Sequence, residues 1–273
     1  MLSPARFRAL HRRGEPLLLP NAWDLASGLW LAEQGADVVG TTSLGLAVVA
    51  GEPDGAGATL EPTLELARRL VAAGIAVTVD LESGFSHDPA EVAEIVSHLA
   101  ELGVVGVNLE DSTVDGRLSD PELLAAKVSA VVRGAPALYV NARTDAFWVE
   151  TGDSVGERTT ASLERARRYL DAGASGVFVP GALDDRTITA LVDGIPAPVN
   201  VLAQSGRSID QLAALGVARV STGSLLFRAS LAAVGAVLED VRAGARPGTG
   251  RLSVPGYDRV AALGNETGPG STG

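Results

Sequence analysis

Two acidic residues stand two positions apart at the point where an apolar run of the sequence ends. The segment VTVDLESGF, residues 77–85, passes from β-favouring residues directly into Asp80 and Glu82. Side chains alternate along a strand, so these two carboxylates are expected to lie on the same face. Like charges held that close repel each other and shift each other's pKa values, so the pair requires a neutralising partner.

Polar pairs with the same spacing end two further apolar runs. Asn108 and Glu110 follow VVGV, and Asn141 and Arg143 follow ALYV. Each pair is expected to share one face of its strand, whereas Asp111 points the other way. Ligands made only of oxygen, with no His or Cys beside them, suit Mg²⁺ or Mn²⁺ rather than Zn²⁺. Three or four carboxylates beside one arginine therefore predict a divalent cation, with one carboxylate bound directly and others holding its waters.

The order of apolar and helical patterns predicts the elements that position these residues. Eight strand-like runs alternate with helical patterns, which indicates right-handed βα units around a parallel sheet. This count suits a closed (β/α)8 TIM-type barrel, whose site lies at the C-terminal ends of the strands. An open doubly wound sheet is disfavoured because PNAWD, not a Gly-rich dinucleotide loop, follows the first strand. The other strand ends contribute Asn21, Asp24, Thr42, Ser43, Asp145, Pro180, Gly181, Gln204 and Ser205.

The chain is expected to form a single domain followed by a tail. The barrel is predicted over residues 1–244, with a leading N-terminal helix over 1–13 and the helix over about 225–241 as part of the barrel. Residues 245–273 are rich in Gly and Pro and are predicted to form a partly disordered C-terminal tail. Within this tail, YDRVAAL at 257–263 is the segment with helical character.

Composition excludes several classes of function. The formal net charge of −11 over 273 residues argues against nucleic acid and anionic membranes as partners. There is no cysteine, which excludes disulfides, thiolate metal sites and cysteine nucleophiles. No run reaches the roughly 18 apolar residues of a membrane span, so we expect a cytoplasmic protein that acts on a small molecule.

These motifs resemble those of the isocitrate lyase/phosphoenolpyruvate mutase superfamily. The similar segments are PNAWD at 20, TTS at 41, EPDG at 52, DLESG at 80, NLED at 108 and NARTD at 141, in the family's order. The resemblance implies a Mg²⁺-dependent enzyme that makes or breaks a C–C or P–C bond beside a pyruvate-like enolate. It also implies an α-keto or α-hydroxy acid as substrate and a homo-oligomer, either a dimer or a tetramer. Exchange of a full C-terminal helix between subunits is not expected.

The resemblance makes Asp80 the direct metal ligand. Asp54, Glu82 and Glu110 would orient metal-bound waters, although many members carry a second Asp where Glu82 stands. The catalytic base stays open between Asp54 and a water held by Glu110. For any one of these acids taken alone, a helix cap or a solvated loop position is the alternative.

The resemblance also assigns the substrate side of the site. Ser43 and the backbone amides of Leu44 and Gly45 would hold the substrate carboxylate, and Asn108 is a further candidate for substrate binding. Arg143 would bind substrate oxygens and balance the charge that develops on an enolate.

The sequence departs from the best-known members at two places. The segment after NLED is only STVDGRLSD, whereas isocitrate and methylisocitrate lyases carry a KKCGH-type loop with a catalytic cysteine and mutases carry a longer gating loop. The sixth run ends VFVPG, without the histidine of mutases or the glutamate of methylisocitrate lyases. We therefore predict a lyase or hydrolase that cleaves a C–C bond in a small α-keto or α-hydroxy (di)carboxylate. The alternatives are a P–C bond enzyme, of the phosphonopyruvate hydrolase or phosphoenolpyruvate mutase type, and a non-catalytic keto-acid binder.

Overall fold

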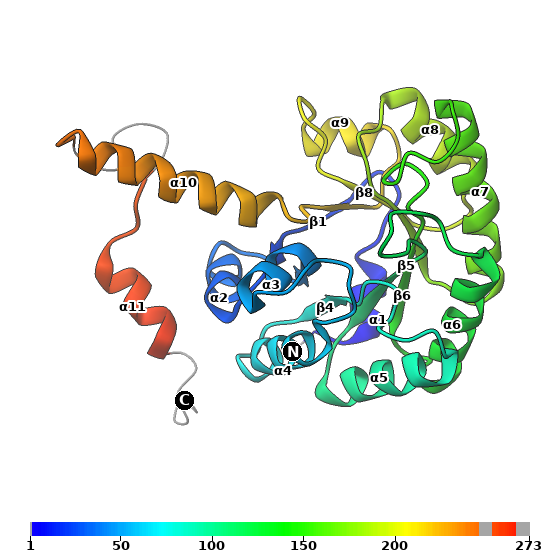
Figure 1. Cartoon of the computed structure of the whole chain (residues 1–273), viewed down its shortest axis with the longest axis horizontal. Coiled ribbons are helices and arrows are strands. Elements are labelled where there is room, and N and C mark those ends of the chain that lie inside the picture. Colours follow the sequence, from blue (N-terminus) through cyan, green and yellow to red (C-terminus); the bar gives the residue numbers. More distant parts are fainter. Residues whose placement is uncertain (1, 246–252, 266–273) are drawn as a thin grey trace.

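Parallel strands form the wall of a nearly closed barrel, and helices surround it (Figure 1). We describe residues 2–245 and 253–265 of the chain from a computed structural model. The strands are β1 Leu17–Leu19, β2 Asn21–Ala22, β3 Val39–Thr41, β4 Val77–Asp80, β5 Gly106–Glu110, β6 Tyr139–Arg143, β7 Gly176–Val179, β8 Val199–Leu202 and β9 Arg219–Ser221. The helices are α1 Pro4–Ala9, α2 Leu25–Glu33, α3 Ser43–Ala50, α4 Leu60–Ala72, α5 Pro89–Leu102, α6 Pro121–Gly134, α7 Val155–Asp171, α8 Asp185–Gly194, α9 Ile209–Ala214, α10 Leu225–Arg242 and α11 Tyr257–Asn265.

Pro20 interrupts the first strand of the barrel. β1 pairs with β9 and β2 pairs with β3, both in parallel, so β1 and β2 together occupy one strand position. Proline lacks an N–H, so the ladder breaks at this residue, although its carbonyl still accepts a hydrogen bond from the Gly40 amide. The sheet order β1-β9-β8-β7-β6-β5-β4-β3-β2 therefore describes eight barrel positions. The predicted (β/α)8 TIM-type barrel is confirmed.

Helix boundaries follow the local chemistry of the sequence. α5 begins after Asp88, whose carboxylate accepts a hydrogen bond from the Ala90 amide. It ends at Gly103, which adopts the left-handed conformation that glycine tolerates best. Asp24, one of the polar residues at the end of the first strand, forms a capping box with Ser27 at the start of α2. Its role is therefore to start a helix.

α1 closes the N-terminal end of the barrel. Phe7 is fully buried and lies edge-on to Tyr139 of β6, with ring centroids 5.4 Å apart. Gly106 of β5 leaves room for this ring, because a Cβ there would lie 2.8 Å from Phe7 Cε1. The predicted leading helix thus exists and packs against the first residues of the strands, at the end opposite to the predicted site.

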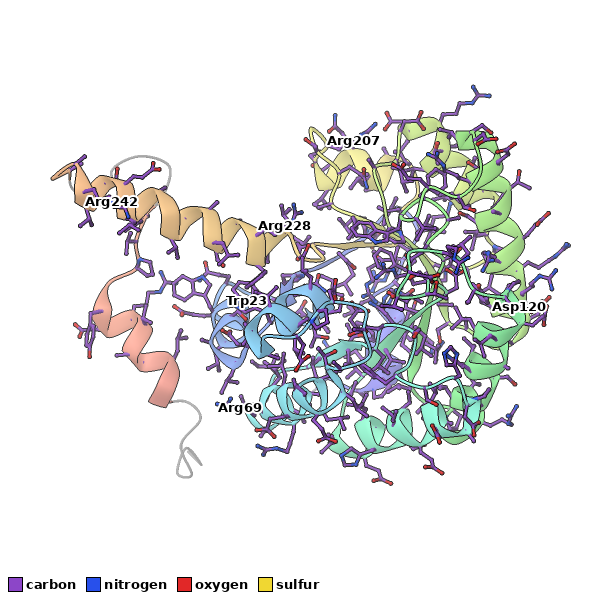
Figure 2. The ribbon with its side chains drawn as sticks, viewed as in Figure 1. Trp23, Arg69, Asp120, Arg207, Arg228 and Arg242 are labelled. Atoms are coloured by element: carbon purple, nitrogen blue, oxygen red, sulfur yellow. The ribbon has the colours of Figure 1, made fainter. Side chains whose placement is uncertain are left out.

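α10 has an unusual position among the helices. It forms over the expected residues but stands out from the barrel, with Arg228 near its inner end and Arg242 near its tip (Figures 1 and 2). Phe227 is its only buried residue, so α10 packs little against the barrel, and its assignment to the barrel domain stays a prediction. Helical periodicity predicts that a helix forms, but it does not say what covers the helix.

α11 lies beside α2. Arg259 of α11 forms an ion pair with Glu33 of α2 at 2.6 Å and lies 4.6 Å from the ring centroid of Trp30. The helical character of YDRVAAL is therefore confirmed. Residues 246–252 and 266–273 of the predicted tail lie outside the described residues, and the boundary at residue 244 stays a prediction. Among the helices of the described ranges, none has the length and apolar character needed to cross a bilayer.

Candidate active site

A cavity of about 370 Å³ opens where the strands of the barrel end. It brings together residues that are far apart in the sequence. The predicted site residues that line it are Ser43, Leu44, Asp54, Asp80, Glu82, Asn108, Glu110 and Arg143. Gly45 is the predicted residue that does not line it. A Cβ at Gly45 would lie 2.7 Å from Trp23, so this glycine allows α3 to pack closely against the chain after β2.

Arg143 is held between two carboxylates. Its Nη1 lies 2.7 Å from Glu110 Oε2, and its Nε lies 2.5 Å from Asp145 Oδ1. The guanidinium also lies 5.8 Å from the ring centroid of Trp148 and 5.7 Å from that of Phe178. Burial lowers the pKa of Arg143, but the charges of Glu110 and Asp145 outweigh it and raise that pKa above its ordinary value. The cavity therefore contains a fixed and permanently charged guanidinium.

Three acids of the cavity, Asp80, Glu82 and Glu110, have raised pKa values because they are buried. For Asp80, burial raises the pKa, Arg143 opposes the shift, and the charge of Asp54 adds to it. For Glu110, burial raises the pKa to about 8, Arg143 again opposes the shift, and the charge of Asp80 adds to it. A cation bound among these carboxylates would favour their ionised forms.

Glu82 is turned toward the loop that carries Asp54. Its Oε1 accepts a 2.6 Å hydrogen bond from the Thr59 hydroxyl, and its Oε2 accepts one of 3.4 Å from the Gly57 amide. β4 ends at Asp80, and Glu82 has a φ of 51°, so the alternation of the strand does not extend to it. Glu82 lines the cavity, yet both of its carboxylate oxygens hold the loop that brings Asp54 to the rim.

The turn after β4 is strained and is held by a buried lysine. Glu82, Gly84 and Phe85 have φ values of 51°, 98° and 60°. This conformation costs a non-glycine residue roughly 1–2 kcal/mol. Lys127 of α6 is buried and donates a 2.7 Å hydrogen bond to the Ser83 carbonyl, and burial lowers the pKa of Lys127. α6 therefore supports the strained backbone beside the site.

Ser112 was missed by the sequence reasoning, although it links two acids of the site. Its hydroxyl lies 2.6 Å from Asp145 Oδ2 and 3.2 Å from Glu110 Oε1. Asp111 points away from the cavity, as predicted, and accepts hydrogen bonds from the Asp145 amide at 2.8 Å and the Tyr169 hydroxyl at 2.6 Å. The signal for Ser112 is its place directly after NLED, at the end of the strand that carries Glu110.

The first turn of α3 faces the cavity. Ser43 and Leu44 begin this helix, and Thr42 makes no side-chain cap within the described structure. The Ser43 amide instead interacts with Asp80 and lowers the pKa of that carboxyl. The amides of Leu44 and Gly45 have no backbone partner in the described ranges. Leu44 lines the cavity, so its amide can bind an anion at a helix N-terminus, whereas Gly45 is buried outside the cavity lining.

Three of the other strand-end residues are structural. Asn21 accepts hydrogen bonds from the amides of Thr222 and Gly223, at 3.0 and 2.9 Å, which ties the first strand position to the chain after β9. Gln204 bridges the Leu183 amide and the Gly181 carbonyl, both at 3.0 Å. Asn141 is buried and does not line the cavity.

The carboxylates around the cavity suit a magnesium ion that keeps most of its waters better than a metal ion bound only by protein ligands. Within residues 2–245 and 253–265, no group of three His, Cys, Asp or Glu side chains is arranged to hold a metal ion. The ionisable donors around the cavity are nevertheless carboxylates, and Asp80 and Glu110 have raised pKa values that a cation would relieve. Mg²⁺ keeps several waters and takes only one or two carboxylates directly. The residues present are therefore compatible with Mg²⁺ held by one carboxylate.

The family model for phosphoenolpyruvate phosphomutase matches residues 7–242 of the chain. An uncharacterized protein of Mycobacterium tuberculosis is 44% identical over 225 residues, which cover 82% of this chain and 84% of that protein. A 2-methylisocitrate lyase of Bacillus subtilis is 29% identical over 203 residues, which cover 71% of this chain and 65% of the lyase. These similarities extend over most of the barrel.

Solved structures share the architecture. A crystal structure from Burkholderia cenocepacia J2315, provisionally assigned as a phosphonomutase, has a TM-score of 0.81 at 37% identity and covers 87% of this chain and 98% of that chain. A phosphonopyruvate hydrolase in complex with oxalate and Mg²⁺ has a TM-score of 0.81 at 21% identity, with 97% of this chain and 96% of that chain covered. The second likeness concerns the fold alone.

Proposed function

The chain belongs to the phosphoenolpyruvate phosphomutase family, and on this premise we propose that it is a Mg²⁺-dependent enzyme that cleaves a C–C bond in a small α-keto or α-hydroxy acid. The observation that carries the proposal is the meeting of Asp80, Glu110 and Arg143 in one cavity at the ends of neighbouring strands. Buried acids and a fixed guanidinium together offer a place for a divalent cation and for the oxygens of a keto acid.

The acids divide into one direct ligand and its supports. Asp80 would hold the cation directly, while Asp54 and Glu110 would orient its waters. Glu82 would act mainly through the loop, since its oxygens already bind Thr59 and the chain at residue 57. Bound Mg²⁺ would supply positive charge that draws electron density toward the substrate oxygens.

The substrate would lie between α3 and Arg143. Ser43 and the amide of Leu44, which line the cavity, would bind the carboxylate next to the keto or hydroxyl carbon. Arg143 would take up the negative charge that develops as the C–C bond breaks. Because two carboxylates already fix the direction of its N–H groups, little reorganisation is needed at that moment.

Bond cleavage needs a base that removes a proton from a substrate hydroxyl or from an attacking water. The electron pair of the C–C bond then passes into an enolate, which takes a proton from solvent. Asp54 is exposed at the rim, whereas Glu110 is engaged by Arg143 and Ser112. We therefore assign the base to Asp54.

Turnover assays on a panel of α-keto and α-hydroxy acids test this function. Release of pyruvate, glyoxylate or oxalate should require both Mg²⁺ and Arg143, and Arg143→Met should lose about 10²-fold or more in kcat/KM because it removes charge stabilisation. Arg69→Met, at an exposed position of α4, is the matched control and should keep wild-type turnover (Figure 2). Turnover that persists without Mg²⁺, or in Arg143→Met, would contradict the proposal.

Cleavage of a P–C bond is the second candidate function. The observation that favours it is the similarity to the Burkholderia protein provisionally assigned as a phosphonomutase. The loop after β5 argues against mutase chemistry, because it is short and Ser112 bridges back to Leu118, which leaves little chain to exclude water. Phosphate released from phosphonopyruvate, faster than any C–C cleavage, would assign the chain to this second function.

A further inference from the structure

Beneath the cavity lies a buried arginine that has no carboxylate partner in the described structure. Arg219 of β9 is 1% exposed, and its Nη2 donates to Asn108 Oδ1 at 3.4 Å while its Nε donates to Ser221 Oγ at 3.2 Å. Both acceptors line the cavity. Burial lowers the pKa of Arg219 to about 10, so the guanidinium stays charged at neutral pH.

The side-chain amide of Asn108 has a defined direction in this network. Its Oδ1 accepts a second hydrogen bond, of 3.0 Å, from Asn141 Nδ2. Its own Nδ2 has no acceptor among the described residues, yet it is not one of the fully enclosed polar atoms, unlike Asn141 Oδ1. Asn108 therefore turns its carbonyl oxygen toward the barrel interior and its NH₂ group toward the cavity.

The two asparagines alone would not fix this direction. If both amides rotated by half a turn, Asn108 would donate to Asn141 and the number of hydrogen bonds between them would be unchanged. Asn108 would then present an acceptor to the cavity instead of a donor. Arg219 removes this equivalence, because a guanidinium donates and never accepts, so the rotated Asn108 would place its NH₂ group against Arg219 Nη2.

We propose that Arg219 is a positioning residue that fixes the Asn108 amide with its NH₂ group facing the substrate. The cavity floor then selects ligands that present an acceptor oxygen at this point. The inference rests on the proposed function, since it takes the ligand to be a keto or hydroxy acid.

Calorimetric titration with oxalate and with oxamate, both at saturating Mg²⁺, measures this selectivity. Oxalate presents only acceptor oxygens, whereas oxamate replaces one carboxylate by an amide that can donate. The wild type should bind oxalate more tightly than oxamate, so the ratio of its oxalate affinity to its oxamate affinity should exceed one. Arg219→Gln should lower this oxalate-to-oxamate affinity ratio about tenfold, because glutamine can accept a hydrogen bond and so frees the two asparagine amides to rotate. Arg219→Lys offers only donors and should keep the ratio within about threefold of wild type.

Asn108→Ala tests the same point without altering the buried arginine. It should lower the oxalate-to-oxamate ratio as Arg219→Gln does, whereas Arg8→Gln, the same change at an exposed position of α1, should leave the ratio unchanged. An unchanged ratio in Asn108→Ala, or equal losses in the Gln and Lys variants of Arg219, would overturn the positioning role alone. A wild type that binds neither ligand with Mg²⁺ would overturn the proposed function together with this inference.

Discussion

Acidification should destabilise the chain through one buried histidine. His11 follows α1, is 8% exposed and stacks on Tyr139, with ring centroids 4.0 Å apart. Its Nδ1 lies 2.9 Å from the Phe7 carbonyl, so this nitrogen carries the proton, while Nε2 is enclosed without a partner in the described structure. A second proton would place a charge there, close to the cation of Arg219. Burial, together with that cation, lowers the pKa of His11 from 6.5 to about 3.

The size of the effect follows from the two pKa values. In the unfolded chain His11 takes up a proton near pH 6.5, whereas in the folded chain it stays neutral down to about pH 3. Between these values the unfolded state binds more protons, so the free energy of unfolding falls as the pH falls. Each pH unit below 6.5 costs about 1.4 kcal/mol, so a change from pH 7.5 to pH 4.5 costs about 2–3 kcal/mol through this residue.

Urea unfolding at pH 7.5 and pH 4.5 measures this loss. His11→Gln keeps an N–H group for the Phe7 carbonyl but does not titrate, so its loss of stability should be smaller than that of the wild type by about 2 kcal/mol. His98→Gln is the matched control, because His98 is exposed, and its pH response should equal that of the wild type. Equal pH responses of the wild type and His11→Gln would refute the reasoning.

Other experiments test separate parts of the molecule. Lys127→Met should lower the free energy of unfolding by about 1–3 kcal/mol, because the Ser83 carbonyl loses its buried donor; an unchanged melting temperature would contradict this. Isocitrate and methylisocitrate should be cleaved about 10²-fold or more slower than the best α-keto or α-hydroxy acid, measured as glyoxylate or pyruvate release, because the chain has no cysteine to serve as the acid. Comparable rates would mean that another acid serves the site. Light scattering at micromolar concentration should show a dimer or tetramer, because α10 exposes the apolar side chains of Leu231, Val234 and Leu238. A protein that is only monomeric at this concentration would contradict the prediction of an oligomer.

Alternation along the strands predicted most of the side chains that reach the cavity. Asp80, Asn108, Glu110 and Arg143 lie within the last residues of regular strands, where the two-residue period holds. Glu82 shares the cavity without following the pattern, because β4 ends before it and its φ is positive. The strand pattern therefore predicts which side chains face the cavity only up to the end of the strand. Beyond that point, the backbone conformation of the following turn decides where a side chain points.

Partners that come from distant parts of the chain could not be predicted in this way. Thr59 binds Glu82 from 23 positions away, and Arg219 binds Asn108 from 111 positions away. In the sequence, Arg219 is only a charged residue within the apolar run VARVSTGS. Its position beneath the cavity becomes visible once the barrel is closed. α10 is a similar case, because its sequence predicts a helix but contains no information about which surface covers it.

Binding of Mg²⁺ together with oxalate is the measurement that tests the metal site most directly. Thermal unfolding of the wild type should show stabilisation by Mg²⁺ or Mn²⁺ that grows with oxalate and reaches about 2.7 kcal/mol at a hundredfold excess over Kd. Asp80→Ala should lose this stabilisation, whereas Asp153→Ala, at an exposed position before α7, should keep it. A wild type without a metal-dependent shift, or a full shift in Asp80→Ala, would contradict the assignment of Asp80 as the direct ligand.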